Sequence, residues 1–174
     1  TWESTMHQRL ALKNLQHGKY ASKETHCFTA TIYLDGERAF KVSNQGAGHA
    51  NDYFPYQRQN ERDFHSYYRY VSDAAMDWMK ETNPDFPYLD DDWTCLDFVI
   101  THLINEHFLL KTMRDVLKSK VVYLDTKDDL VTWVSERPTP EKLSYYRRYF
   151  PTWKLFNDIE SEDEQLILWR RKIR

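Results

Sequence analysis

The chain has 174 residues with a formal net charge of −3, and 41% of its residues are hydrophobic and 29% charged. These values exclude a disordered chain, and the mixed charges favour neither a general polyanion binder nor a strongly acidic DNA mimic. No apolar stretch reaches the roughly 18 residues of a membrane helix, and the first residues lack the apolar core of a signal peptide. We therefore expect a single domain over 1–174 without a membrane contact.

Cysteine usage indicates a reducing compartment. Two cysteines, Cys27 and Cys95, are too few for a disulfide framework or a structural zinc site. Each has apolar neighbours, so we expect a reduced, buried thiol. This favours the cytoplasm, and the sequence predicts no metal and no cofactor.

The N-terminal part predicts antiparallel strands. Residues 10–20 form a candidate first strand, and residues 25–46 form a hairpin around Asp35-Gly36, because β-branched and aromatic residues alternate on both sides of this dipeptide. A two-residue turn would set an apolar face against a polar one, so we predict a three-residue loop, residues 34–36, with Gly36 left-handed. One face then carries Phe28, Ala30, Ile32, Phe40 and Val42.

Farther along the chain, the apolar spacing becomes helical. It predicts helices over about 61–80 and 94–118, with two prolines of the segment 81–93 breaking the pattern between them. There follow a second hairpin around residues 126–128, a helix over about 141–149, a last strand near 152–157 and a C-terminal helix capped by Ser161 and Glu164. This order predicts an α+β fold with an N-terminal hairpin or small sheet, two long helices, a second hairpin and C-terminal helices.

The motif Ser-Tyr-Tyr-Arg occurs twice, at residues 66–69 and 144–147. Interleaved aromatics and arginines are typical of nucleic-acid binding. Helical periodicity, however, places Tyr67, Tyr68 and Tyr146 on apolar stripes, which favours an ordinary core edge. The side chains that remain outside are candidates for a protein interface. They are Arg69, Tyr70, Tyr145, Arg147, Arg148 and Tyr149.

The loop at residues 43–52 is a second candidate site, because it holds two of the four glycines. Glycine permits positive φ and close approach, and consecutive N–H groups can hold an anion. The loop lacks the P-loop pattern and the dinucleotide fingerprint. It is either a binding or active-site loop or a structured connection. Its candidate residues are Asn44, Gly46, Gly48, His49 and Asn51.

Other constellations are weaker. Cys27, His49 and Asn51 have the residue types of a Cys-His-Asn nucleophilic site, but composition alone does not make a site. His102 and Glu106 stand at i and i+4, for which a solvated helix face is favoured over a metal site. His107 lies between apolar positions, so we expect a core histidine. No catalytic residue is assigned.

The segment from Leu12 to Asn51 resembles a group of small uncharacterised phage, prophage and bacterial proteins. The shared pattern is Ser-x-Glu-Thr-x-Cys-Phe-x-Ala at residues 22–30, then Asp-Gly, then Asn-x-Gly-x-Gly at residues 44–48. Residues 139–171 are similar to the C-terminal part of such proteins. Relatives carry a further glycine where this chain has His49. The resemblance implies a phage or mobile-element setting and no mechanism.

Three functions remain open. The first is a non-catalytic interaction protein of a phage or mobile element, with a host enzyme or defence protein as its partner. The second is an enzyme acting on a nucleotide or nucleic acid at the 44–52 loop. The third is a nucleic-acid binder, which would use basic residues on both motif helices. These are Arg58, Arg62, Arg69, Arg147 and Arg148.

Overall fold

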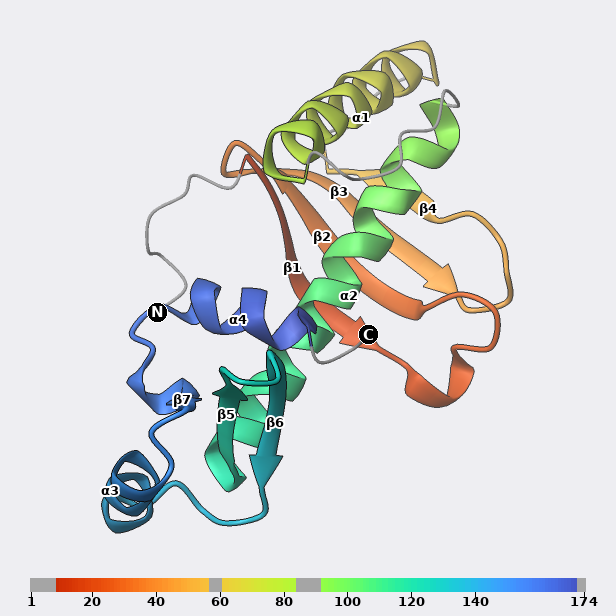
Figure 1. Cartoon of the computed structure of the whole chain (residues 1–174). Helices are drawn as coiled ribbons and strands as arrows, with labels where there is room; N and C mark the ends of the chain where they lie inside the picture. Colours follow the sequence, from red (N-terminus) through yellow and green to blue (C-terminus); the bar gives the residue numbers. More distant parts are fainter. Residues whose placement is uncertain (1–8, 57–60, 84–91, 172–174) are drawn as a thin grey trace. The chain divides into compact units, whose positions relative to one another are not determined.

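The computed structural model describes residues 9–56, 61–83 and 92–171 (Figure 1). It has a mixed α+β fold, which confirms the fold class expected from the sequence. The chain divides into two compact units, residues 1–105 and 106–174. Helix α2 (Asp92–Ser119) contributes to both of them, and the single domain expected from the sequence stays a prediction.

The first unit is built on an antiparallel sheet in the order β1-β2-β3-β4. Its strands are β1 (Leu10–His17), β2 (Cys27–Leu34), β3 (Glu37–Gln45) and β4 (Asp52–Pro55), with a short 3-10 helix η1 (Lys19–Ala21) before β2. Helix α1 (Glu61–Thr82) and the first part of α2 complete the unit, and Asp97 of α2 accepts a hydrogen bond from Tyr53 of β4.

The hairpin loop between β2 and β3 differs from the predicted one. Asp35 and Gly36 have φ of 51° and 86° and form a two-residue turn, with Leu34 opposite Glu37, so the three-residue loop was wrong. The face to which the side chains of β3 point changes instead at a β-bulge, where Ala39 is inserted between the pairs Tyr33–Arg38 and Ile32–Phe40. The predicted shared face is confirmed, because Ala30 lies opposite Val42 and Phe28 opposite Asn44.

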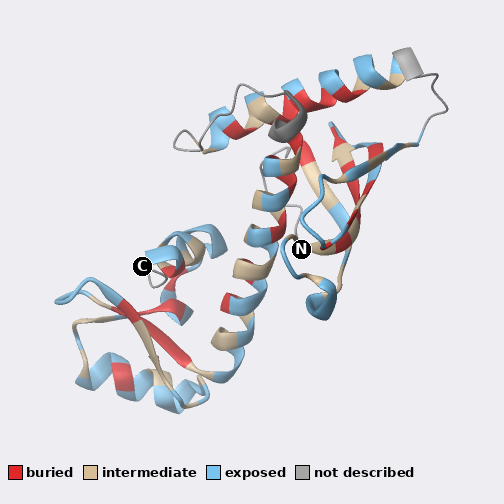
Figure 2. Ribbon diagram, turned by 90° about the vertical axis from the view of Figure 1, so that its right-hand side faces the viewer, coloured by how far each residue is buried: buried red, intermediate tan, exposed pale blue. Residues whose placement is uncertain are grey.

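Phe40 lies at the centre of the first unit's core. Its side chain is fully buried, and its ring contacts Tyr53, Phe64, Tyr67 and Tyr68 at centroid distances of 5.2–6.2 Å. Figure 2 shows the resulting burial pattern on α1, with a buried stripe along one side and exposed residues along the other. The stripe includes Tyr68, Val71, Ala75 and Met79, as helical periodicity predicts.

The second unit contains a three-stranded antiparallel sheet in the order β6-β5-β7. Its strands are β5 (Val121–Asp125), β6 (Leu130–Val134) and β7 (Trp153–Leu155). Helix α3 (Pro140–Tyr149) precedes β7, and η2 (Phe156–Asp158) and α4 (Glu162–Arg171) follow it. The second hairpin, the α3 helix and the last strand are thus confirmed.

Both faces of this second sheet are covered. On one face Val122, Leu124 and Val131 pack with Leu110 and Met113 of α2 and with Trp169 of α4. On the other face Val121, Tyr123 and Leu155 pack with Tyr146 of α3. Since successive strand residues point to opposite faces, β5 is buried at Val121–Leu124 without alternation.

Candidate interaction surface

Helix α3 is held to its sheet by its cap and by Tyr146. Thr139 caps the helix by accepting a hydrogen bond from the Lys142 N–H at 3.3 Å, and Pro140 takes the first turn, where its missing N–H costs nothing. Tyr146 is buried against β5 and β7, and its hydroxyl donates to Glu136 at 2.7 Å. This hydrogen bond, followed by burial, raises the pKa of Tyr146 to about 12.

Two tyrosine rings on the outer side of α3 form the most exposed aromatic feature of the second unit. Tyr145 is 50% exposed and Tyr149 is 58% exposed, and their ring centroids lie 4.9 Å apart. The guanidinium of Arg148 lies 5.4 Å from the centroid of the Tyr149 ring. We call Tyr145, Arg148 and Tyr149 the α3 aromatic patch.

A stack of rings supports the α3 aromatic patch from below. The Tyr145 ring contacts Tyr146 and Phe150, and Phe150 stacks on Trp153 at 4.2 Å. Trp153 in turn stacks on Tyr123 of β5 at 3.5 Å with an interplanar angle of 9°. The exposed rings therefore rest on an ordered aromatic layer and not on a loop.

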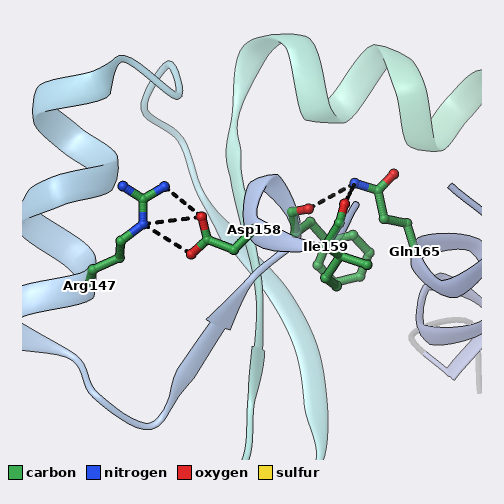
Figure 3. Close-up of polar contacts among 5 residues, drawn as sticks. Arg147, Asp158, Ile159 and Gln165 are labelled. Atoms are coloured by element: carbon green, nitrogen blue, oxygen red, sulfur yellow. Dashed lines mark hydrogen bonds and ion pairs between the residues drawn. The ribbon is translucent and has the colours of Figure 1, made fainter. Parts of the chain in front are cut away.

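Arg147, which the sequence places in the same candidate interface, has a different role. Its guanidinium binds both carboxylate oxygens of Asp158, with N–O distances of 2.5–3.1 Å (Figure 3). Beside this pair, Gln165 donates to the backbone carbonyls of Phe156 and Ile159. Arg147 thus fastens α3 to the segment before α4, and the ion pair raises its pKa.

On α1, the predicted division between buried and exposed side chains at the motif of residues 66–69 is confirmed. Tyr68 is 4% exposed and Tyr67 is half-buried, whereas Tyr70 is 52% exposed and Arg69 is exposed. The ring of Tyr70 lies against that of Tyr67 at 6.3 Å. Arg58 and the side chain of Arg62 lie outside the described residues.

In the 44–52 loop, the side chain of Asn44 forms hydrogen bonds with neighbouring residues of the same chain. Asn44 is 6% exposed, and its side-chain oxygen Oδ1 accepts from the Thr25 hydroxyl and the Gly46 N–H at 2.9 and 2.8 Å. Its amide nitrogen donates to the His49 carbonyl and to the Asn51 side chain. All of its polar atoms are thereby engaged within the chain.

The glycines of this loop are explained by close approach. Gly46 and Gly48 have φ of 83° and 84°. A methyl group on Gly46 would overlap the Ala21 carbonyl oxygen and lie 2.9 Å from the Cys27 Cβ, and one on Gly48 would overlap the Glu24 carboxylate. The Gly46 carbonyl also accepts from the N–H groups of Lys23, Glu24 and Thr25. This geometry favours a structured connection over an active-site loop.

The Cys-His-Asn combination gains no support from these contacts. The Asn51 side chain accepts from Asn44 and donates to Tyr53, so it is committed to the loop. Tyr53 donates to Asp97 of α2, and burial, reinforced by the Asp97 charge, raises the pKa of Tyr53. Cys27 is a free thiol but half-buried, not buried as expected, and His49 is exposed. The Cys95 side chain lies outside the described residues.

Two other expectations concern α2. Glu106 forms an ion pair with Arg170 of α4. Its carboxylate therefore has a partner other than His102. His107 is exposed, and the expected core position was wrong because the buried positions next to it are Ile104 and Leu110. Partial desolvation of the exposed ring, followed by the charges of Lys111 and Arg114, lowers the pKa of His107.

Sequence reasoning missed a histidine pair at the end of the first sheet. His17 Nε2 lies 3.1 Å from His26 Nδ1, and His26 Nε2 lies 2.9 Å from the Asn105 side-chain oxygen. Burial, followed by the His26 charge, lowers the pKa of His17. The two histidines come from separate segments, so only the strand register brings them together.

No protein-family model, curated protein or solved structure matches this chain. Among the helices that the structure describes, none has the length and apolarity required for a membrane crossing. Within the same residues, His, Cys, Asp and Glu side chains do not gather in groups of three or more that could hold a metal.

Proposed function

We propose that this protein is a non-catalytic interaction protein that binds a partner protein through the α3 aromatic patch. The observation that carries this proposal is the pair of exposed rings, Tyr145 and Tyr149, beside the Arg148 guanidinium. Tyrosine and arginine are enriched among residues that dominate binding energy, since they offer a large contact area together with polar groups.

The rigidity under the α3 aromatic patch supports the same proposal. The Thr139 cap, the Tyr146–Glu136 hydrogen bond and the Arg147–Asp158 ion pair fix the helix before any partner arrives. Binding then spends little free energy on ordering the contact side chains, which favours affinity.

For the biological setting we propose a phage or mobile genetic element, with a host enzyme or defence protein as partner in the host cytoplasm. The support is the resemblance at residues 22–30 and 44–48. The free thiol of Cys27 fits a reducing compartment.

The test is capture of the partner by purified, immobilised protein from a lysate of the host bacterium at moderate salt. The captured protein is identified by mass spectrometry and its affinity is then measured with both components purified. The informative variant is the double substitution Tyr145→Ala/Tyr149→Ala. Tyr20→Ala is the matched control, because Tyr20 is a tyrosine on η1 with 96% exposure.

We expect the double variant to bind at least about 30-fold more weakly, since truncation of a single hot-spot residue already costs about 2 kcal/mol or more. Tyr20→Ala should bind like the wild type. Equal affinity of all three proteins would exclude the α3 aromatic patch as the interface, and the absence of any specific partner would contradict the proposal as a whole.

A further inference from the structure

The four-stranded sheet of the first unit has a second face that the helices leave open. Residues opposite one another in the register share a face, and one such cross-strand row is Lys13–Thr31–Lys41–Phe54. Lys13, Lys41 and Phe54 are exposed, Phe54 to 55%, whereas Thr31 in the middle of the row is only 6% exposed. The core residues Phe28, Ala30 and Ile32 alternate with this row and point to the other face.

Aromatic and cationic side chains are interleaved on this face. Tyr33 lies opposite Arg38, which donates to the Tyr33 hydroxyl at 3.0 Å. The Arg38 guanidinium also lies 5.6 Å from the ring centroid of Tyr56, and Lys13 lies 4.6 Å from that of Tyr33. Tyr56 is 45% exposed and hydrogen-bonds Thr31, which places it over the middle of the sheet. We call Lys13, Tyr33, Arg38, Lys41, Phe54 and Tyr56 the open sheet face.

The charge on this face differs from that of the whole chain. The protein carries a formal net charge of −3, yet the open sheet face holds three cations. Two acids lie near them in the register: Glu37, which precedes Arg38 and is opposite the buried Leu34, and Asp52, which is opposite Ser43. Such a local excess of positive charge suits an anionic partner.

A shallow open hollow of about 560 Å³ adjoins the cations. The next row on the same face is Gln16–Thr29–Ser43, and these three side chains contribute to the lining of the hollow. The other lining residues are His17, Gly18, Cys27, Phe28, Asn44 and Gln45. Its lining therefore combines hydroxyl and amide groups, which can donate and accept hydrogen bonds, with apolar surface.

We propose that the open sheet face binds single-stranded RNA. Exposed rings stack on unpaired bases, lysine and arginine hold the phosphates, and the hydroxyl and amide groups of the hollow can contact a ribose 2′-OH. A duplex keeps its bases stacked inside and cannot use the Phe54 ring. An acidic protein surface would pair with the cations but would leave the ring faces and the hollow unused. This site is separate from the α3 aromatic patch.

Fluorescence anisotropy with a labelled 12-nucleotide oligouridylate tests the proposal on the full chain. We expect binding that weakens about tenfold between 50 and 150 mM salt, because three phosphate contacts give a log–log slope of about −2 for single strands. Phe54→Ala should weaken binding at least fivefold. Lys41→Gln should weaken binding and make the salt slope shallower by about 0.7.

Matched controls separate this site from general charge and from unfolding. Lys118→Gln removes an exposed lysine of α2, and Tyr70→Ala removes an exposed ring of α1, so both should bind like the wild type. Circular dichroism checks that each variant is folded. Thymidylate of equal length should bind more weakly because it lacks the 2′-OH. Equal binding of the DNA would overturn the RNA assignment, and no RNA binding, or unchanged binding of Phe54→Ala and Lys41→Gln, would overturn the site.

Discussion

The two sheets of this protein differ in how many of their faces are covered. In the first unit, β2 buries Phe28, Ala30 and Ile32 on one face. On the other face Thr31, which is hydrogen-bonded to Tyr56, is buried, whereas Thr29 and Tyr33 are half-exposed. In the second unit, β5 is buried on both faces. The first unit therefore offers a sheet face to a partner, whereas the second has no open sheet face around β5 and offers the outer side of α3.

The strand sequences already indicate this difference. Apolar and polar residues alternate in CFTATIYL, as in an antiparallel strand with one wet face, whereas VVYL is continuous, as in a strand covered on both sides. Alternation thus indicates where a binding face can exist. It does not indicate which ligand the face takes, because that depends on the cross-strand rows.

The largest expected effect is a difference in stability between substitutions at two neighbouring residues of β3. Phe40→Ala should lower the free energy of unfolding by about 3–5 kcal/mol, because it empties the centre of the core. Lys41→Ala, one residue later on the open sheet face, should change it by less than about 0.5 kcal/mol. Urea denaturation followed by circular dichroism measures both values. A loss of several kcal/mol for Lys41→Ala would show that the second face is covered after all.

In β5, by contrast, substitutions at two neighbouring residues should lower the free energy of unfolding equally. Val121→Ala and Val122→Ala both remove fully buried methyl groups, on opposite faces, so each should cost about 2 kcal/mol. Urea denaturation of the two variants tests this, with the midpoints compared where the unfolding free energy depends equally on urea concentration. If only one of the two destabilises the protein, the second sheet is one-sided like the first.

Much of the architecture could be predicted from the sequence because it follows from periodicity. The long helices, the second hairpin, α3 and α4 lie where the apolar spacing places them. Strand β4 was not predicted, since Asp52–Pro55 is short and contains a proline that a strand tolerates at its end. The hairpin loop was wrong because a bulge at Ala39 changes strand parity as a longer loop would, and periodicity cannot separate the two.

The candidate sites were predicted less well, for a related reason. Helical periodicity identifies Tyr145 and Tyr149 as outward residues, but it cannot show that Arg147 is held by Asp158, eleven residues later. The open sheet face was missed because its members come from four separate segments. Only the register of β1 to β4 places Lys13, Lys41 and Phe54 in one row.

The smallest expected effect is a pH dependence at the end of the first sheet. The pKa of His17 is lowered from its ordinary value of 6.5, so the folded protein binds this proton less readily than the unfolded chain. Stability that is complete above pH 6.5 should therefore be lost as the pH falls through 6.5 towards the lowered pKa. The loss should be modest, because the His17 ring is only partly buried.

Thermal unfolding between pH 7.5 and 5.5 measures this loss. The variant His17→Gln should show a flatter dependence of Tm on pH than the wild type. His107→Gln is the matched comparison in the second unit, since the pKa of His107 is also lowered but the residue is exposed. If His107→Gln flattens the curve and His17→Gln does not, the acid sensitivity belongs to the second unit. In that case the His17–His26 contact would not be the source of the acid sensitivity.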